Sequence, residues 1–204
     1  MAAPSVATQT ARSYYSNIVK NGDVLIGYLN IGGRKYRQYV EESTHYKYII
    51  DTYSSNLSFL RTAKDLYTLG INNYRFMLKL YDEQLINVDP YSPTLTAEQI
   101  QRVMIECKRN IWYFLREVAR IPVEGGAMGP GAGMRYQLNR GNLASTWCFV
   151  NNIDHYLVLP RQIGKTKSTL EAILWTFIFS TIRTLNISAS LSEIFRIPRA
   201  MLRN

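Results

Sequence analysis

The sequence has 204 residues, of which 47% are hydrophobic, so it suffices for a packed core and excludes a chain that is disordered throughout. Its formal net charge of +9 favours a polyanionic partner, nucleic acid first, although a basic protein without such a partner is the alternative. Two cysteines, Cys107 and Cys148, are too few for a disulfide framework and indicate a reducing compartment, and no signal peptide is recognisable at the start.

Residues 1–124 are expected to form a mostly helical N-terminal region. Within it, residues 24–31 have an extended pattern, and Gly32-Gly33 predicts a turn that leads into a second strand at 34–40. The pattern from 41 to 85 is mostly that of helices. A sheet is therefore expected only at the beginning of this region.

Several of the 15 tyrosines stand beside basic residues. These clusters are Tyr36 with Arg34, Lys35 and Arg37, and Tyr46 and Tyr48 with Lys47. Aromatic rings among basic side chains can stack on bases or lie beside phosphates, which predicts a DNA contact. The alternative is that the rings are half-buried and only their hydroxyls reach water.

The clearest predicted helix runs from Thr96 to Arg120. Thr96 and Gln99 have the spacing of a capping box, and Pro122 ends the pattern. Apolar residues recur at helical spacing and predict one buried face. This face comprises Ile100, Val103, Met104, Cys107, Ile111, Phe114, Leu115 and Val118.

Residues 125–135 are rich in glycine and predict a flexible linker or a lid. Residues 136–150 are expected to form a loop and a helix, in which Trp147 and Phe149 pack. The whole of 136–204 is then the predicted beginning of a P-loop NTPase core with a parallel sheet. The expected fold class is α/β, with a helical region before this core.

The most informative motif is Leu159-Pro160-Arg161-Gln162-Ile163-Gly164-Lys165-Thr166. An apolar run at 155–159 predicts a strand before it and a helical pattern follows it, which is the order of a phosphate-binding loop, although the usual first glycine is replaced by Leu159. Gly164 allows close approach of the backbone, and Lys165 is expected to contact the β- and γ-phosphates of ATP. Thr166 is expected to hold Mg²⁺ through its hydroxyl. The alternative is a strand, turn and helix without a ligand.

The helix after this loop has one predicted apolar stripe, which is expected to pack on the sheet. The stripe comprises Leu170, Ile173, Leu174, Phe177 and Ile178, with Lys167, Ser168 and Glu171 on the other side. The apolar run from 172 to 182 is shorter than the roughly 20 residues of a membrane span.

The loop resembles the variant phosphate-binding loop of the large terminase subunit of tailed bacteriophages, where Arg-Gln precedes Gly-Lys-Thr. Two further blocks look like the region upstream of the loop in that family. They are Asn110-Ile111-Trp112-Tyr113-Phe114-Leu115-Arg116-Glu117 with Arg120-Ile121-Pro122, and Tyr136-Gln137-Leu138-Asn139-Arg140-Gly141-Asn142. The resemblance covers roughly residues 105–180.

This resemblance implies an ATPase that drives double-stranded viral DNA into the capsid. The implied partners are the portal protein and the small terminase subunit, with a homo-oligomeric ring of the full-length form in the host cytoplasm at the capsid portal. Lys165 and Arg161 take the catalytic roles, the latter as a charge stabiliser, with a salt bridge or a DNA contact as its alternative. Gln162, Ile163, Gly164, Lys165, Thr166 and Lys167 would bind the phosphates of ATP, and Thr166 the Mg²⁺. Gln137 and Arg140 match the region that contacts adenine, or are simply polar surface residues.

The sequence also departs from this family. No apolar strand after Lys165 ends in an acidic pair, since the only acidic residues there are Glu171 and Glu193. The nuclease half of the family is absent as well, so the chain is expected to be an N-terminal part of such a motor. Two alternatives stay open. One is a non-catalytic module that binds DNA or the portal and carries a vestigial loop, and the other is a different P-loop enzyme, such as a helicase-like ATPase.

Overall fold

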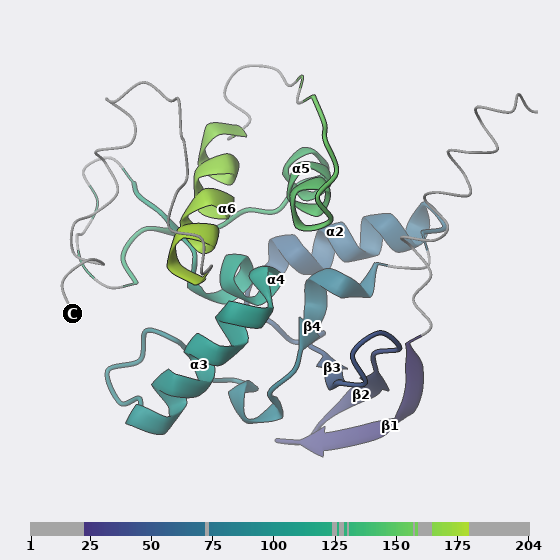
Figure 1. The fold of residues 1–204 in the computed structure, drawn as a ribbon. Helices are drawn as coiled ribbons and strands as arrows, with labels where there is room; N and C mark the ends of the chain where they lie inside the picture. Colours follow the sequence, from purple (N-terminus) through teal and green to yellow (C-terminus); the bar gives the residue numbers. More distant parts are fainter. Residues whose placement is uncertain are drawn as a thin grey trace, which may run out of the picture. The chain divides into compact units, whose positions relative to one another are not determined.

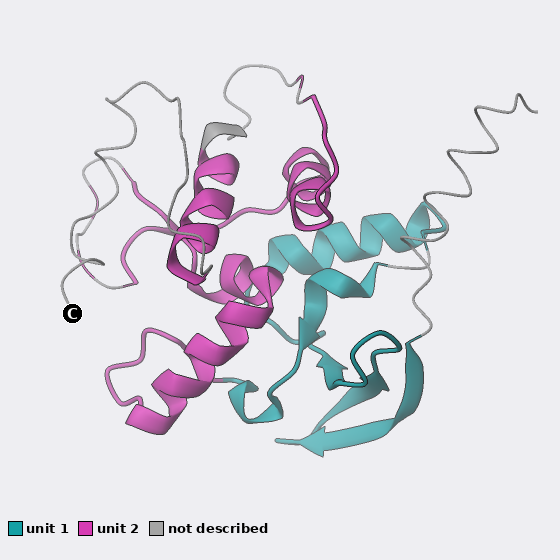
Figure 2. Ribbon diagram, in the orientation of Figure 1, with its two compact units in different colours: residues 1–87 teal, residues 88–204 magenta. Residues whose placement is uncertain are grey.

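The computed structural model describes residues 23–71, 74–123, 126, 129, 131–156, 158 and 165–179 (Figure 1). The chain divides into two compact units, residues 1–87 and residues 88–204 (Figure 2). Both units contain helices and strands, and both sheets in the described ranges are antiparallel. The expected mixture of helix and strand is therefore confirmed, whereas these residues do not include a parallel sheet.

The first unit is built on a four-stranded sheet with the order β1-β2-β3-β4. Its strands are β1 (Val24–Ile31), β2 (Arg34–Val40), β3 (Lys47–Ile50) and β4 (Lys79–Leu80). Gly32 and Gly33 have φ angles of 56° and 74°, so both adopt the left-handed conformation that a tight hairpin turn requires. The predicted hairpin is thus confirmed, and β3 and β4 extend it into a sheet.

The mostly helical pattern predicted for residues 41–85 is wrong over β3 and β4. Tyr48, Ile49 and Ile50 are all buried, and the Tyr48 ring stacks on Tyr39 of β2 with 5.6 Å between ring centroids. This contact joins residues that are distant in sequence, so a local periodicity does not reveal it. Regular α-helix in this range is limited to α2 (Leu57–Thr68), with short 3-10 turns at Arg75–Leu78 and Glu83–Leu85.

A buried lysine connects the strands of this unit. Lys79 of β4 is 7% exposed, and its Nζ lies 3.0 Å from Asp23 Oδ2 and 2.7 Å from Glu41 Oε1. Tyr48 donates a hydrogen bond to Asp23, and Tyr81 donates one of 3.2 Å to Glu41. Burial alone would raise the pKa of Glu41, but hydrogen bonds from Lys79 and Thr44 lower it overall. Lys79 therefore balances one of the two negative charges and holds both carboxylates in one cluster inside the unit.

The second unit begins with the predicted capped helix. In α3 (Ala97–Arg109), Thr96 and Gln99 form the expected capping box. The helix does not continue to Arg120, because Asn110 has a φ of −137° and caps a new start at α4 (Ile111–Tyr113). A π-helical turn, η3 (Phe114–Val118), follows directly.

The predicted apolar face of this segment is only partly buried. Val103, Cys107 and the residues that follow Asn110 form the core, whereas Ile100 and Met104 are 51% and 50% exposed. Within α3 the buried side is that of Val103, Glu106 and Cys107, so the packed face is rotated away from Ile100 and Met104. The core residues here are Val103, Cys107, Ile111, Phe114 and Leu115.

Part of the glycine-rich segment is packed and is not the free connection that the sequence predicts. Strand β6 (Met134–Arg135) pairs with β5 (Arg120–Ile121). A Cβ at Gly131 would lie 2.7 Å from Tyr91 Cγ, and one at Gly133 would lie 2.6 Å from the Ile121 carbonyl oxygen. Their φ angles of 75° and 97° also disfavour other residues.

The last two helices occur where the sequence predicts them. Helix α5 (Arg140–Val150) starts with a capping box of Asn139 and Asn142, and α6 spans Lys165–Phe179. Phe149, expected to pack, is 37% exposed. None of the helices in the described part of the chain combines the length and apolar composition that a membrane span needs.

Replacing Gly133 with alanine tests the packing of this segment. We expect Gly133→Ala to lower the free energy of unfolding by roughly 1–3 kcal/mol, because the methyl group collides with the β5 backbone and the left-handed conformation is strained. Urea unfolding followed by circular dichroism gives this quantity. Gly27→Ala is the control, since a Cβ there meets nothing within 4 Å. If Gly133→Ala and Gly27→Ala lowered the free energy of unfolding equally, the close contact of Gly133 with the β5 backbone would be contradicted.

Candidate functional site

The predicted phosphate-binding loop leads into α6. Arg161, Gln162, Ile163 and Gly164 lie outside the described residues. The backbone of Lys165 and Thr166 forms the start of α6, and Lys167 is exposed in the same turn. The first N–H groups of a helix have no partner within it and carry partial positive charge, so this helix start is suited to an anion.

The strand predicted before the loop is not present in the residues that the structure describes. His155, Tyr156 and Val158 have no regular secondary structure, and Tyr156 and Val158 are 101% and 90% exposed. A strand of a parallel core is buried on both faces, which these two side chains are not. His155 instead contacts the preceding helix, with its Nε2 3.2 Å from Ser145 Oγ.

Helix α6 packs with a different face from the predicted one. Ser168 and Ala172 are 7% and 5% exposed, whereas Phe177 and Ile178 are 51% and 40% exposed. The packed face continues to Trp175, whose Nε1 donates a 2.7 Å hydrogen bond to the carbonyl oxygen of Cys107 in α3. Ser168, predicted on the side opposite the apolar stripe, therefore lies on the packed face, and the prediction that the stripe is the packed face is wrong. Small residues allow the helix to approach its neighbours closely, which a hydrophobic stripe does not indicate.

Tyr136 links α5 and α6. It is 1% exposed, and burial raises the pKa of its hydroxyl, while the hydroxyl groups of Ser168 of α6 and Thr146 of α5 act on this pKa in the opposite direction. Both serine and threonine therefore lie next to the hydroxyl. This contact holds the segment that begins at Tyr136 against the second turn of α6.

Gln137 and Arg140, the predicted adenine contacts, follow Tyr136 and are both exposed. The Gln137 side chain donates to the backbone carbonyl oxygen of Arg135 at 3.1 Å, and the backbone carbonyl oxygen of Gln137 accepts from Asn142 Nδ2 at 2.8 Å. Arg140 is the first residue of α5. The structure thus ties the Gln137 segment to α6, the helix that begins with Lys165, through Tyr136 and Ser168.

Glu171 is a half-buried acid on the side of α6 that the sequence predicts to lie opposite the apolar stripe. Burial raises the pKa of its carboxyl to about 7. Its charge in turn raises the pKa of Tyr91 and Tyr136, so it lies among these rings, and no hydrogen bond or ion pair joins it to any described residue. The signal that could have located it is the spacing of Ser168, Glu171 and Trp175, which share one helix face.

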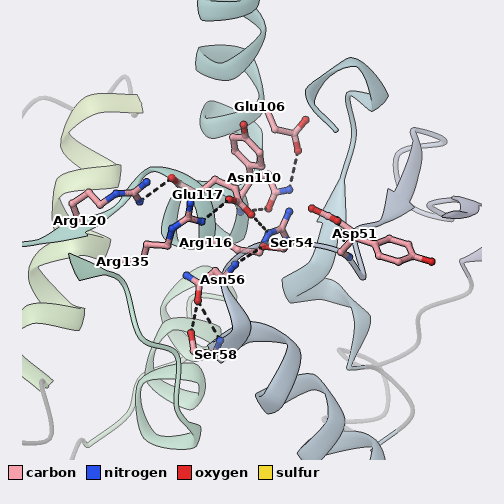
Figure 3. Close-up of polar contacts among 12 residues, drawn as sticks. Asp51, Ser54, Asn56, Ser58, Glu106, Asn110, Arg116, Glu117, Arg120 and Arg135 are labelled. Carbon is pink, nitrogen blue, oxygen red and sulfur yellow. Dashed lines mark hydrogen bonds and ion pairs between the residues drawn. The ribbon is translucent and has the colours of Figure 1, made fainter. Parts of the chain in front are cut away.

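Three arginines surround one glutamate in the block at 110–122 (Figure 3). Arg116 is fully buried, and its Nε lies 2.9 Å from Glu117 Oε1. Arg135 of β6 reaches the other oxygen of Glu117 at 3.5 Å, and Arg120 donates to the carbonyl oxygens of Glu117 and Ala119. The cluster connects η3 with the β5-β6 pair, and so fixes the strand from which Tyr136 and Gln137 emerge.

The described residues include no group of three or more His, Cys, Asp or Glu side chains that could hold a metal ion. Comparison with known protein families, curated proteins and solved structures finds no match to this chain. The geometry of α6 and its neighbours, together with the loop motif, is therefore the basis for a functional proposal.

Glu171 predicts a stability that depends on pH. The pKa of its carboxyl is higher in the folded state than in the unfolded state, so protonation of Glu171 favours the folded state. This contribution to the free energy of unfolding is fully present below about pH 4.5 and is lost as the pH rises through about 7. We expect Glu171→Gln to make the protein more stable at pH 8 by about 1–3 kcal/mol and to flatten the pH dependence. Urea unfolding at pH 5 and pH 8 measures both effects.

Glu98→Gln serves as the control, because the Glu98 side chain is 73% exposed and pairs with Arg102 at the helix surface. An unchanged pH dependence in Glu171→Gln would show that the carboxyl is hydrated in the folded protein.

Proposed function

We propose that this chain is the N-terminal part of a viral DNA-packaging motor ATPase, the large terminase subunit, and that it binds ATP through residues 159–166. The observation that carries the proposal is the position of Lys165. It begins a 15-residue helix directly after Arg161-Gln162-Ile163-Gly164. A phosphate-binding loop needs this order, because the lysine and the free N–H groups of the helix then face the same anion.

ATP would be held at this helix start. Gly164 and the N–H groups of the loop would approach the phosphates, and Lys165 would add a positive charge near the β- and γ-phosphates. Thr166 would bind Mg²⁺, which neutralises charge on the phosphates during hydrolysis. Arg161 would stabilise the charge that develops on the transferred phosphoryl group, and Gln162, Ile163 and Lys167 would complete the loop.

The contact of Tyr136 with Ser168 supports a role for Gln137 and Arg140 at the nucleotide. Ser168 lies three residues after Lys165, one turn along the helix, so the segment held by Tyr136 is anchored near the start of α6. Both Gln137 and Arg140 are exposed and carry hydrogen-bond donors. In the proposed function these two residues contact the adenine.

The exposed apolar face of α6 supports a larger α/β core. Phe177 and Ile178 are about half exposed, at 51% and 40%, on the side away from Ser168 and Ala172. In a P-loop core, the helix after the loop covers a parallel sheet, and this face is available for it. We therefore propose that the parallel sheet belongs to the assembled motor, together with the acidic pair needed for hydrolysis.

The proposed motor acts on double-stranded viral DNA in the host cytoplasm at the capsid portal. Its partners would be the portal protein and the small terminase subunit, and its full-length form would assemble as a homo-oligomeric ring. A non-catalytic module with a vestigial loop is a second candidate. Glu171 favours it, since partial burial raises the pKa of this carboxyl to about 7 and so weakens it as a ligand for Mg²⁺.

Nucleotide binding tests the proposal. We expect Lys165→Ala to weaken the binding of Mg²⁺-ATP roughly tenfold or more, because a charged hydrogen bond to phosphate contributes about 1.5–3 kcal/mol. Titration calorimetry measures the affinity. Lys108→Ala is the matched control, since it removes an exposed positive charge from α3, outside the proposed site.

Equal affinities of the wild type and Lys165→Ala would remove the phosphate-binding role. Binding without release of inorganic phosphate, even when the rest of a terminase motor is supplied, would favour the vestigial loop over the motor ATPase.

A further inference from the structure

The hairpin of β1 and β2 is a basic ribbon. Between Val24 and Val40 the sequence contains Arg34, Lys35 and Arg37 and no acidic residue. The nearest carboxylates in sequence on either side, Asp23 and Glu41, are both paired with the buried Lys79. Lys79 offsets one of these two negative charges, so a single negative charge remains against the three positive charges of the ribbon.

One face of the ribbon gathers four exposed polar or aromatic side chains. In the register of the two strands, Tyr28 is opposite Arg37 and Asn30 is opposite Lys35. Side chains on a strand alternate between the two faces, so these four residues share one face. All four are exposed, and the Tyr28 side chain is 51% exposed.

The tyrosines that the sequence suggested for DNA contact are mostly elsewhere. Tyr36 and Tyr48 are 1% and 2% exposed and cannot reach a ligand. Tyr46 is 55% exposed, but its ring lies edge-on to Tyr81, with 6.5 Å between centroids. The candidate surface for a DNA contact is therefore the face of the ribbon that contains Tyr28, and not these rings.

Lys35 is held in place without being neutralised. Its Nζ lies 4.2 Å from the centroid of the Tyr28 ring, a cation–π contact that restrains the side chain and leaves its charge intact. Within the described ranges, no hydrogen bond or ion pair joins the side chain of Lys35 or Arg37 to another residue. The ribbon face therefore presents two positive charges to solvent.

We propose that this face, formed by Tyr28, Asn30, Lys35 and Arg37, binds the phosphate backbone of double-stranded DNA. The choice of DNA rests on the proposed function, whereas the position of the contact rests on the ribbon itself. Lys35 and Arg37 are two residues apart, so their side chains leave the strand about 7 Å from each other and can contact separate phosphates. The Asn30 amide adds a neutral donor.

Duplex DNA fits this face better than a single strand. Base stacking needs a free aromatic ring, and the Lys35 ammonium already covers the Tyr28 ring. A two-stranded ribbon also has the dimensions that the major groove admits. The expected contact is electrostatic and independent of base sequence.

The test measures binding of a short fluorescent duplex of mixed sequence by anisotropy, without nucleotide, from about 50 to 200 mM salt. For Lys35→Gln combined with Arg37→Gln, we expect a roughly tenfold weaker complex and a salt slope reduced by about 2, since two phosphate contacts are lost. The matched control is Arg61→Gln with Lys64→Gln, which removes the same charge from the exposed surface of α2. Its slope should not change.

Equal losses in the two double variants would overturn the proposal, because net charge alone would then explain the binding. A single strand that binds more tightly than the duplex, and that Tyr28→Leu weakens more than the double variant does, would also overturn it in favour of base stacking. Repeating the duplex titration with Lys165→Ala separates the two proposals. Loss of ATP binding in Lys165→Ala with unchanged DNA binding would show that the loop does not take part in DNA binding. Loss of DNA binding in the ribbon variant with unchanged ATP binding would show that the ribbon does not take part in nucleotide binding.

Discussion

The candidate site depends on how α6 packs against the rest of the second unit. Two polar contacts fix this packing. The indole of Trp175 donates to the Cys107 carbonyl at 2.7 Å, and Tyr136 lies between Ser168 and Thr146. A helix fixed near both ends cannot slide or rotate freely, so the position of its first residue, Lys165, follows from these contacts. The arginines around Glu117 have a related role, since they anchor the strand that carries Tyr136.

Features that depend on neighbouring residues could be predicted from the sequence. The hairpin at Gly32-Gly33 follows from a turn that only residues with positive φ accommodate easily. The start of α3 follows from the capping box of Thr96 and Gln99, and the start of α6 at Lys165 agrees with the order of the loop motif. In each case, a short stretch of chain contains both the signal and its physical cause.

Features that depend on distant residues could not be predicted in this way. Strand β3 has four residues and is stabilised by β2 and β4, so its local pattern resembles part of a helix. The packed face of α6 contains Ser168 and Glu171, because close approach to α5 and the buried Tyr136 outweighs the more apolar stripe on the other side. The proposed nucleotide site shows the same division. Its motif can be recognised in the sequence, but the partial burial of Glu171 is visible only once the helices are packed.

The separation of the aromatic residues between the units gives the protein two built-in optical reporters. The three tryptophans, Trp112, Trp147 and Trp175, all belong to the second unit, and only four of the 15 tyrosines do, namely Tyr91, Tyr113, Tyr136 and Tyr156. Selective excitation of indole therefore follows the second unit alone, whereas tyrosine emission comes mainly from the first. Because Trp175 is on α6 itself, release of this helix would contribute a red shift to the indole emission that is independent of the sheet of the first unit.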